Sequence, residues 1–574
     1  MDACGIDPVE LYLREYKRSF AELTAGFIDN AVREAGIDSA ANAALARKIN
    51  SLAVERDSLS QQKRSWVLLL CALAFVFLVW GGWLLYASSE GGAPSVLNWI
   101  LFIFYSLLAL MCVWSKCVPK IKKLSSAINN LNGIISSKIN EALDQLRPLY
   151  SMFDWNTVTK LIEKILPHLQ FDDFLPEERL EEFYNHFALS EAFTNSKSVL
   201  YTHSGTHYGY PFVFLMTNDF SWGEKTYYGH KTIYWKVRVK GSDGKIQTIE
   251  KSQTLTASVS KPIPVFTEEK ILLFGHDAAP SLSFTRSPSR LSGRKDSFLS
   301  NVEKKLKLGR LRRLEQNLSD DSDFTMMSNR DFELLFNSTD RDHEIEYRLL
   351  FTPLAQQFMV KLLNDRMAGY GDDFCYQKRR ELTSLISTHL NDLEFSTEPV
   401  SLGEYDLAVV KQIITRRYED FFRSVFFSLA PIFCIPVYNE PRVAFTPQGG
   451  AGANNHRISS WEMESIANYH GQRHYQHPAS ITKSLLKVHN LRHHGGTSSA
   501  SVTAFGFKGK PHTEYISMRG GDGKNHTVRV DWTEYIAVNK TSSFQARQAQ
   551  ASSSNAAPRK QGIHRRSIIS FLPK

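Results

Sequence analysis

Two apolar stretches decide the fold of this chain: WVLLLCALAFVFLVWGGWLLY (residues 66–86) and VLNWILFIFYSLLALMCVW (residues 96–114). Neither contains a charged residue, and each is close to the roughly 20 residues that a helix needs to cross the hydrocarbon core of a bilayer. Each also carries Trp or Tyr near its ends, where amphipathic rings favour the headgroup region. We therefore expect a transmembrane helical hairpin over residues 65–115, rather than two buried helices of a soluble protein.

Basic residues flank this hairpin on both sides, whereas the loop between the two stretches has none. Lys63 and Arg64 precede the first stretch, and the second is followed by Lys116, Lys120, Lys122 and Lys123. The connecting loop 87–95 holds one charged residue, Glu90. Because cytoplasmic loops are enriched in Lys and Arg, we expect two spans with both termini in the cytoplasm.

The rest of the chain is long enough for two or three compact units. Changes in residue pattern predict seven segments outside the hairpin: a cytoplasmic helical segment (1–64), juxtamembrane helices with a coiled coil (116–170), an α+β subdomain with a hairpin (171–284), a basic linker (285–322), a second α+β subdomain (323–445), a histidine- and strand-rich subdomain (446–540) and a disordered basic tail (541–574). The expected fold class is α+β, with N-terminal helices and an antiparallel sheet in the cytoplasmic body.

Local patterns predict individual elements within the body. Strands are expected at 208–216, 232–240, 245–259, 271–274 and 344–350, and later at 501–507, 513–518, 527–530 and 535–538. The tetrapeptides GSDG (241–244) and GGDG (520–523) supply the turns of two hairpins. Helices are expected at 353–366, 376–389 and 405–429. The N-terminal segment 8–62 is expected to be helical with a break at 36–38.

Apolar residues recur every three or four positions along residues 119–146. They are Ile121, Leu124, Ile128, Leu131, Ile135, Ile139 and Leu143. Such a stripe is typical of a short coiled coil. It pairs either with the N-terminal helix of the same chain or with the same helix of another chain. We favour the second arrangement, which predicts a homo-oligomer.

The net charge of +9 is concentrated in two segments, Arg286–Arg313 and the tail after Phe544. For a membrane-anchored protein, anionic lipid headgroups are the first partner to consider, because each nearby Lys or Arg adds about 1 kcal/mol of attraction. Nucleic acid is the second. The remaining alternative is that both segments are simply solvated.

Eight histidines lie between residues 456 and 512, and they offer the chain's candidate metal ligands. His470 and His474 are four residues apart, so on a helix they would share a face, and His477 precedes Pro478. With Glu462 or Glu464 nearby, three such ligands would suffice for a metal ion. However, histidine is also an ordinary structural hydrogen-bonding residue, and this spacing matches no known ligand code.

Common catalytic motifs are absent from the sequence. It contains no GxxxxGK[ST] loop, no HExxH, no GxSxG elbow and no dinucleotide fingerprint, and no CxxC pair occurs among its six cysteines. We assign no catalytic residue and no cofactor. A row of alternating acids at Asp340, Asp342, Glu344 and Glu346 is interpreted as the solvated face of a strand rather than a cation site.

Four blocks of sequence together resemble an uncharacterised family of bacterial two-span membrane proteins with a large cytoplasmic domain. The blocks are WKV (235–237) with TLTASV (254–259) and KPIP (261–264); LFG (273–275) with AAP (278–280) and LSF (282–284); MSNRDFELLFNSTDRDHEIEYRLLFTPLAQ (327–356); and WE (461–462) with IANY (466–469) and HP (477–478). The third block also resembles a separate bacterial domain of unknown function. The resemblance implies a bacterial inner membrane and makes Trp461 and His477 part of a motif, but it supplies no activity.

These observations favour an integral membrane protein that acts as a membrane-anchored scaffold for an unknown cytosolic protein partner. The hairpin carries no intramembrane charge, which favours an anchor over a transport pathway. One alternative is a membrane-tethered metal-dependent enzyme centred on His470, His474 and His477. The second alternative is an oligomeric pore.

Overall fold

The computed structural model describes residues 7–89, 96–150, 152–240, 246–293, 298–316, 324–392, 403–443, 457–549 and 563–571. It divides into two compact units. The helical unit comprises Thr24–Phe153 and Pro399–Arg417, and the body comprises Met1–Leu23, Asp154–Glu398 and Tyr418–Lys574. Helices and antiparallel sheets occur together, so the predicted α+β fold class is confirmed.

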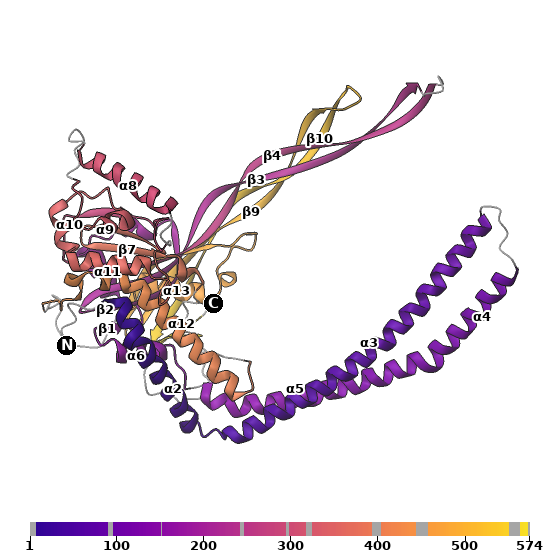
Figure 1. Ribbon diagram of the computed structural model, residues 1–574, viewed down its shortest axis with the longest axis horizontal. Helices are drawn as coiled ribbons and strands as arrows, with labels where there is room; N and C mark the ends of the chain where they lie inside the picture. The colour runs from indigo at the N-terminus through magenta and orange to yellow at the C-terminus, as the bar shows by residue number, and fades with distance from the viewer. Residues whose placement is uncertain are drawn as a thin grey trace. The chain divides into compact units, whose positions relative to one another are not determined.

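The helical unit is built around a long hairpin of helices (Figure 1). Its elements are α2 (Lys17–Glu34, from Thr24 on), α3 (Ser39–Ser89), α4 (Val96–Cys112), the π-helical turn η3 (Val113–Cys117), α5 (Val118–Tyr150) and the first residues of α12 (Leu407–Phe433). The break predicted at 36–38 is confirmed. Gly36 has φ +65°, which ends α2, and the Asp38 carboxylate accepts hydrogen bonds from the N–H groups of Ala40 and Ala41 to begin α3.

Two helices in this unit are long and apolar enough to cross a membrane, by length and composition. They are Ser39–Tyr86 and Val96–Tyr150, and most side chains of their apolar stretches are exposed. The two helices contact each other within these apolar stretches. The Tyr105 hydroxyl donates to the carbonyl of Leu73 at 3.0 Å, and the rings of Phe77 and Phe102 stack at 5.2 Å. A wide band of apolar side chains remains on the surface, as lipid contact requires.

The stripe predicted in residues 119–146 packs against α3 of the same chain. Ile135 and Ala142 of α5 form a buried cluster with Ile49 of α3. The structure therefore shows the pairing within one chain, and self-association through this stripe stays a prediction.

Asn42 joins the start of α12 to this hairpin, since its side chain donates to the carbonyl of Tyr405 at 3.1 Å and accepts from the N–H of Leu407 at 2.9 Å.

The body contains two antiparallel sheets. The seven-stranded sheet has the order β1-β2-β3-β4-β7-β6-β5, and its strands are β1 (Leu169–Phe171), β2 (Lys197–His207), β3 (Tyr210–Lys240), β4 (Ile246–Gly275), β5 (Ser283–Arg286), β6 (Phe374–Arg379) and β7 (Leu382–Ser387). The five-stranded sheet has the order β11-β12-β10-β9-β8, and its strands are β8 (Leu485–His494), β9 (Thr497–Arg519), β10 (Asn525–Gln548), β11 (Ile563–Arg565) and β12 (Ile568–Phe571).

The body also contains helices and single helical turns. They are α1 (Pro8–Leu11), the π-turn η2 (Tyr12–Tyr16), α6 (Thr157–Ile165), α7 (Glu177–Asn185), η4 (Glu191–Thr194), α8 (Phe298–Gln316), α9 (Arg330–Phe336), α10 (Glu344–Leu350), α11 (Pro353–Asn364), η5 (Thr388–Asp392), η6 (Pro436–Asn439), α13 (Ser460–His470) and η7 (Gln472–His474), together with the remainder of α12. The part of α12 within the body carries the predicted phenylalanine run, which is buried. The predicted core helix is thus confirmed.

Helix α13 connects the two sheets through a buried carboxylate. Glu464 accepts from the N–H of Val199 in β2 at 2.7 Å and from the N–H of Val488 in β8 at 3.1 Å. Lys487 also donates to Glu464, at 3.0 Å. Burial raises the pKa of Glu464, and the lysine and the two backbone donors oppose this rise. One acidic side chain therefore satisfies backbone groups of both sheets.

Two predicted elements were assigned the wrong type. Residues 344–350 form helix α10, in which Tyr347 and Leu350 are buried at a spacing of three. The alternating acids nearby are not a solvated strand face: carboxylates of Asp340, Asp342 and Glu346 accept from N–H groups of Thr285, Ser283 and Ser281 at 3.0, 2.6 and 2.9 Å. They cover the free edge of β5, which protects that strand from pairing elsewhere.

Residues 376–389 were predicted as a helix but form β6, β7 and the start of η5. Their Lys, Arg, Glu and Leu residues favour a helix in isolation. In the sheet, Phe374, Tyr376 and Lys378 alternate inward with a period of two, and burial of this face overrides the local preference.

The segments predicted as a basic linker and a disordered tail both contain regular elements. The basic linker 285–322 includes α8, whose Leu311 packs with Phe324 and Leu334. The basic tail 541–574 begins as the end of β10, and its residues 563–571 form β11 and β12, with β12 paired to β10. For the tail, composition was misleading because a few apolar residues, such as Ile568, pack in a core that only the folded body provides. The GSDG turn at 241–244 lies outside the described residues.

Candidate interaction surface

A four-stranded arm extends from the body (Figure 1). It is formed where β3 and β4 continue beyond the seven-stranded sheet, and where β9 and β10 continue beyond the five-stranded sheet. We define the arm as residues 220–240, 246–266, 506–519 and 525–538. The predicted strands in these regions are confirmed, but they merge into two ribbons far longer than the sequence indicated.

The two ribbons of the arm pack face to face over a small apolar core. Ile233, Leu255 and Ala257 from the first ribbon meet Val528 and Val530 from the second. These side chains share a face because alternate residues of a strand point to the same side. Burial of this cluster holds together two ribbons that would each be marginal alone.

Polar contacts fix the register of one ribbon on the other. Lys261 forms an ion pair with Glu514 and lies 4.4 Å from the ring centre of Trp532. Near the far end, the side chain of Gln253 accepts from the N–H of Gly521 at 2.7 Å. Because this contact lies in the turn between β9 and β10, the second ribbon ends there and the first continues beyond it.

The outer face of the first ribbon carries a ladder of hydroxyl groups. Cross-strand hydrogen bonds join Thr226 to Ser260 at 3.0 Å and Thr232 to Thr254 at 3.1 Å. Tyr228 and Tyr234 stand on the same face by strand alternation and are 63% and 69% exposed. Trp222 (53%) and Tyr515 (68%) are also exposed on the arm. Tyrosine and tryptophan are enriched in protein interfaces, where they provide large contact areas.

The inner face of the first ribbon continues past the end of the second. Val237, Val239 and Ile249 follow Ile233 on this face, and here no second ribbon covers them. Val239 and Ile249 are accordingly exposed. The arm thus offers aromatic and aliphatic contact surface along its length, on a framework in which the main chain is already hydrogen-bonded.

The predicted metal ligands do not come together in the described part of the chain. His470 is buried, its Nδ1 lies 2.8 Å from the Tyr475 hydroxyl, and its Nε2 lies 2.6 Å from the Ser570 hydroxyl. His474 lies in η7, after α13 has ended at His470, so these two histidines do not share a helix face. His477 accepts from the N–H of Ala479 at 3.1 Å. Among the residues that the structure describes, no group of three or more His, Cys, Asp or Glu side chains is placed to hold one metal ion. The geometry therefore gives the metal-enzyme alternative no support.

One arrangement that sequence reasoning missed has the connectivity of a catalytic triad. Nδ1 of His389 lies 2.5 Å from the Asp373 carboxylate, and Nε2 lies 3.0 Å from the hydroxyl of Ser428. However, Ser428 is fully buried in the interior of α12 and donates to the carbonyl of Ser424 at 2.8 Å. A nucleophile needs access to substrate, which this site lacks. Asp373 and His389 therefore tie β6 and η5 to α12.

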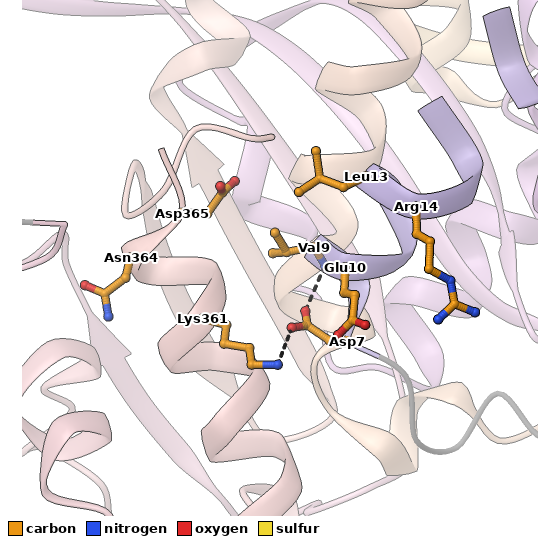
Figure 2. Close-up of a pocket in the computed structure, with 8 residues that line it drawn as sticks. All are labelled: Asp7, Val9, Glu10, Leu13, Arg14, Lys361, Asn364 and Asp365. Carbon is orange, nitrogen blue, oxygen red and sulfur yellow. Dashed lines mark hydrogen bonds and ion pairs between the residues drawn. The ribbon is translucent and has the colours of Figure 1, made fainter. Parts of the chain in front are cut away.

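A pocket of about 630 Å³ lies beside the N-terminal helix α1 (Figure 2). The Asp7 carboxylate accepts from the N–H of Val9 at 2.9 Å and forms an ion pair with Lys361 at 3.0 Å (Figure 2). Asp365 accepts from three successive N–H groups, at residues 367–369. These polar groups already have partners, so they explain how the N-terminus is attached to α11 rather than how a ligand would bind.

No known family model, curated protein or solved structure matches this chain. The resemblance to bacterial two-span membrane proteins therefore stays a prediction.

Proposed function

We propose that this protein is a membrane-anchored interaction protein that presents the paired-ribbon arm to a protein partner. The observation that carries this proposal is the exposure of Tyr228 and Tyr234 on a pre-formed strand face. A soluble surface gains nothing from large aromatic groups in water, whereas a partner that covers them gains both apolar contact and hydroxyl hydrogen bonds.

The arm is suited to binding because little must be ordered when a partner arrives. Its backbone is hydrogen-bonded along both ribbons, and the cluster around Ile233 and Val530 restrains one ribbon on the other. Binding to a pre-organised surface avoids the loss of conformational entropy that a flexible loop would suffer. The exposed aliphatic end at Val239 and Ile249, on the opposite face of the first ribbon, adds a second contact area.

The apolar helices supply the anchor in this proposal. Lys63 and Arg64 before the hairpin, and four lysines after it, favour cytoplasmic placement of both termini and of the body. The resemblance to bacterial two-span proteins further suggests the inner membrane. A reporter that is active only outside the cytoplasm, inserted after Gly92, should be active, and the same reporter at the C-terminus should be silent. The reverse pattern would contradict this orientation.

Site-specific photocrosslinking tests the interaction surface directly. A photoreactive phenylalanine analogue replaces Tyr228 or Tyr234 in the full-length protein, which is expressed in cells and irradiated. We expect each position to form a crosslink with one discrete protein partner, identified by mass spectrometry after denaturing purification.

Met367 is a matched control position, because it is 87% exposed but lies on the body rather than on the arm. The analogue at Met367 should not capture the same protein. If Tyr228 and Tyr234 yield only the mixture of proteins that Met367 yields, the arm is not a specific interaction surface and the proposal fails.

A further inference from the structure

A second cavity lies against helix α8, in the segment that composition predicted to be a linker. Its volume is about 920 Å³. The loop after β5, helix α8 and residues 337–340 form its walls. Helix α8 is held in place by Leu311, which packs against Phe324 and Leu334. The cavity is therefore built by packed elements and not by a mobile basic segment.

Positive charge dominates the walls of this cavity. Arg286 is buried at its base, where it pairs with Asp372 at 2.5 Å. Lys307 donates to the carbonyl of Leu334 at 2.7 Å. Burial lowers the pKa of Lys307, and the nearby charge of Arg286 lowers it further. The carboxylates of Asp372 and Glu303 oppose this lowering.

Two arginines on different elements line this cavity. Arg290 belongs to the loop after β5 and Arg310 belongs to α8, and both line the cavity. Neither forms an ion pair or hydrogen bond with any residue that the structure describes. The walls also carry two acidic residues. Asp340 accepts from the N–H and the hydroxyl of Thr285, and Glu303 lies on α8.

We propose that this cavity binds a phosphoryl group, held between Arg290 and Arg310. Planar guanidinium groups form charge-assisted, two-pronged hydrogen bonds to phosphate oxygens. Hydroxyl groups on the same walls, at Ser287 and Thr339, are available as additional donors. The phosphoryl group belongs either to a soluble phosphate ester or to a phospholipid headgroup. This inference does not depend on the arm or its partner.

The test uses the full-length protein in a neutral detergent. One variant, R290Q/R310Q, removes both unpartnered charges from the cavity. The matched control, R312Q/R313Q, removes two exposed charges from the same helix that do not line the cavity. Binding of inorganic pyrophosphate is measured by calorimetry at constant ionic strength. Retention of phosphatidylglycerol, compared with phosphatidylcholine, is measured by native mass spectrometry.

Either of two results would support the site. Pyrophosphate that binds the wild type and the control, but binds R290Q/R310Q at least about tenfold more weakly, indicates a soluble phosphate ester. Phosphatidylglycerol retained by the wild type and the control but lost from R290Q/R310Q, without pyrophosphate binding, indicates a lipid headgroup. Equal losses in both variants would show non-specific charge attraction and overturn the proposal. Failure of the wild type to bind either probe would also overturn it.

Discussion

The α-carbon of Gly229 in β3 lies directly against the carbonyl oxygen of Arg529 in β10. A Cβ atom at position 229 would overlap that oxygen and the Val530 side chain. Glycine is therefore required here for close approach of two backbones and not for an unusual φ angle. This contact brings the two ribbons near enough for Ile233 and Val528 to be buried together.

Replacing Gly229 with valine should separate the ribbons of the arm. The clashing atom belongs to the main chain, which cannot move aside as a side chain can. We therefore expect the local free energy of unfolding to fall by about 1–3 kcal/mol, and hydrogen exchange across 506–519 and 525–538 to become faster. The control is Gly133→Ala, at a helical position with no atom within 4 Å of the added Cβ. Unchanged exchange in Gly229→Val would show that the ribbons do not depend on this contact.

Acid should destabilise the body through its buried neutral histidines. Burial lowers the pKa of His470 from 6.5 to about 4, with the charges of His474 and Arg565 acting in the same direction. In the unfolded chain His470 becomes protonated below about pH 6.5, whereas in the folded protein it becomes protonated only near pH 4. The contribution of His470 to the free energy of unfolding is therefore fully present above pH 6.5. It decreases by about 3 kcal/mol as the pH falls from 6.5 to 4.

Urea unfolding of the full chain at pH 7.5, 6 and 5 measures this dependence. His470→Gln should lower stability at pH 7.5, because one of the bonds to Tyr475 and Ser570 is lost, but it should flatten the slope with pH. His494→Gln, at an exposed position, should keep the wild-type slope. A slope in His470→Gln as steep as in the wild type would refute the assignment.

The C-terminal strands should detach when their main apolar contact is removed. Ile568 is 1% exposed in the cluster under the five-stranded sheet, and truncation of such a residue costs about 2–5 kcal/mol. Arg565 and Arg566 are buried, so trypsin should cleave after them slowly in the wild type and rapidly in Ile568→Ala. Ile569→Ala, at the adjacent half-buried position, should retain most of the protection. Equal cleavage rates in all three proteins would mean that the strands are not stably docked.

Placing a polar residue in the α3/α5 core should weaken the helical hairpin. Ile135→Asn buries an amide among Ile49 and Ala142, which costs about 1–3 kcal/mol. Ile134→Asn, at a neighbouring exposed position, should have little effect. Circular dichroism follows helix loss, and light scattering of the detergent complex gives the mass. A lower mass for Ile135→Asn alone would favour self-association through residues 119–146, and an unchanged mass would favour the intrachain pairing.

Prediction from sequence worked best where the cause is local. The break at Gly36 follows from a left-handed residue with an acidic helix cap after it, and the turn at Gly520–Gly523 follows from residues that tolerate such geometry. It worked poorly where burial reverses local preference, as in β6, whose Lys378 is fully buried against its usual tendency. The candidate surface was only partly foreseeable, because strands at 232–240 and 245–259 were expected but their pairing with β9 and β10 was not.

The sequence by itself determined that two apolar helices form, and that an α+β body accompanies them, because hydrophobic length and periodicity act within short stretches of chain. Only the tertiary structure decided which of these stretches meet. Gly229 faces Arg529, His470 meets Ser570, and Arg290 faces a cavity shared with Arg310. Each of these arrangements depends on the packing of elements that are distant along the chain or differ in type. Short-range sequence patterns do not specify that packing.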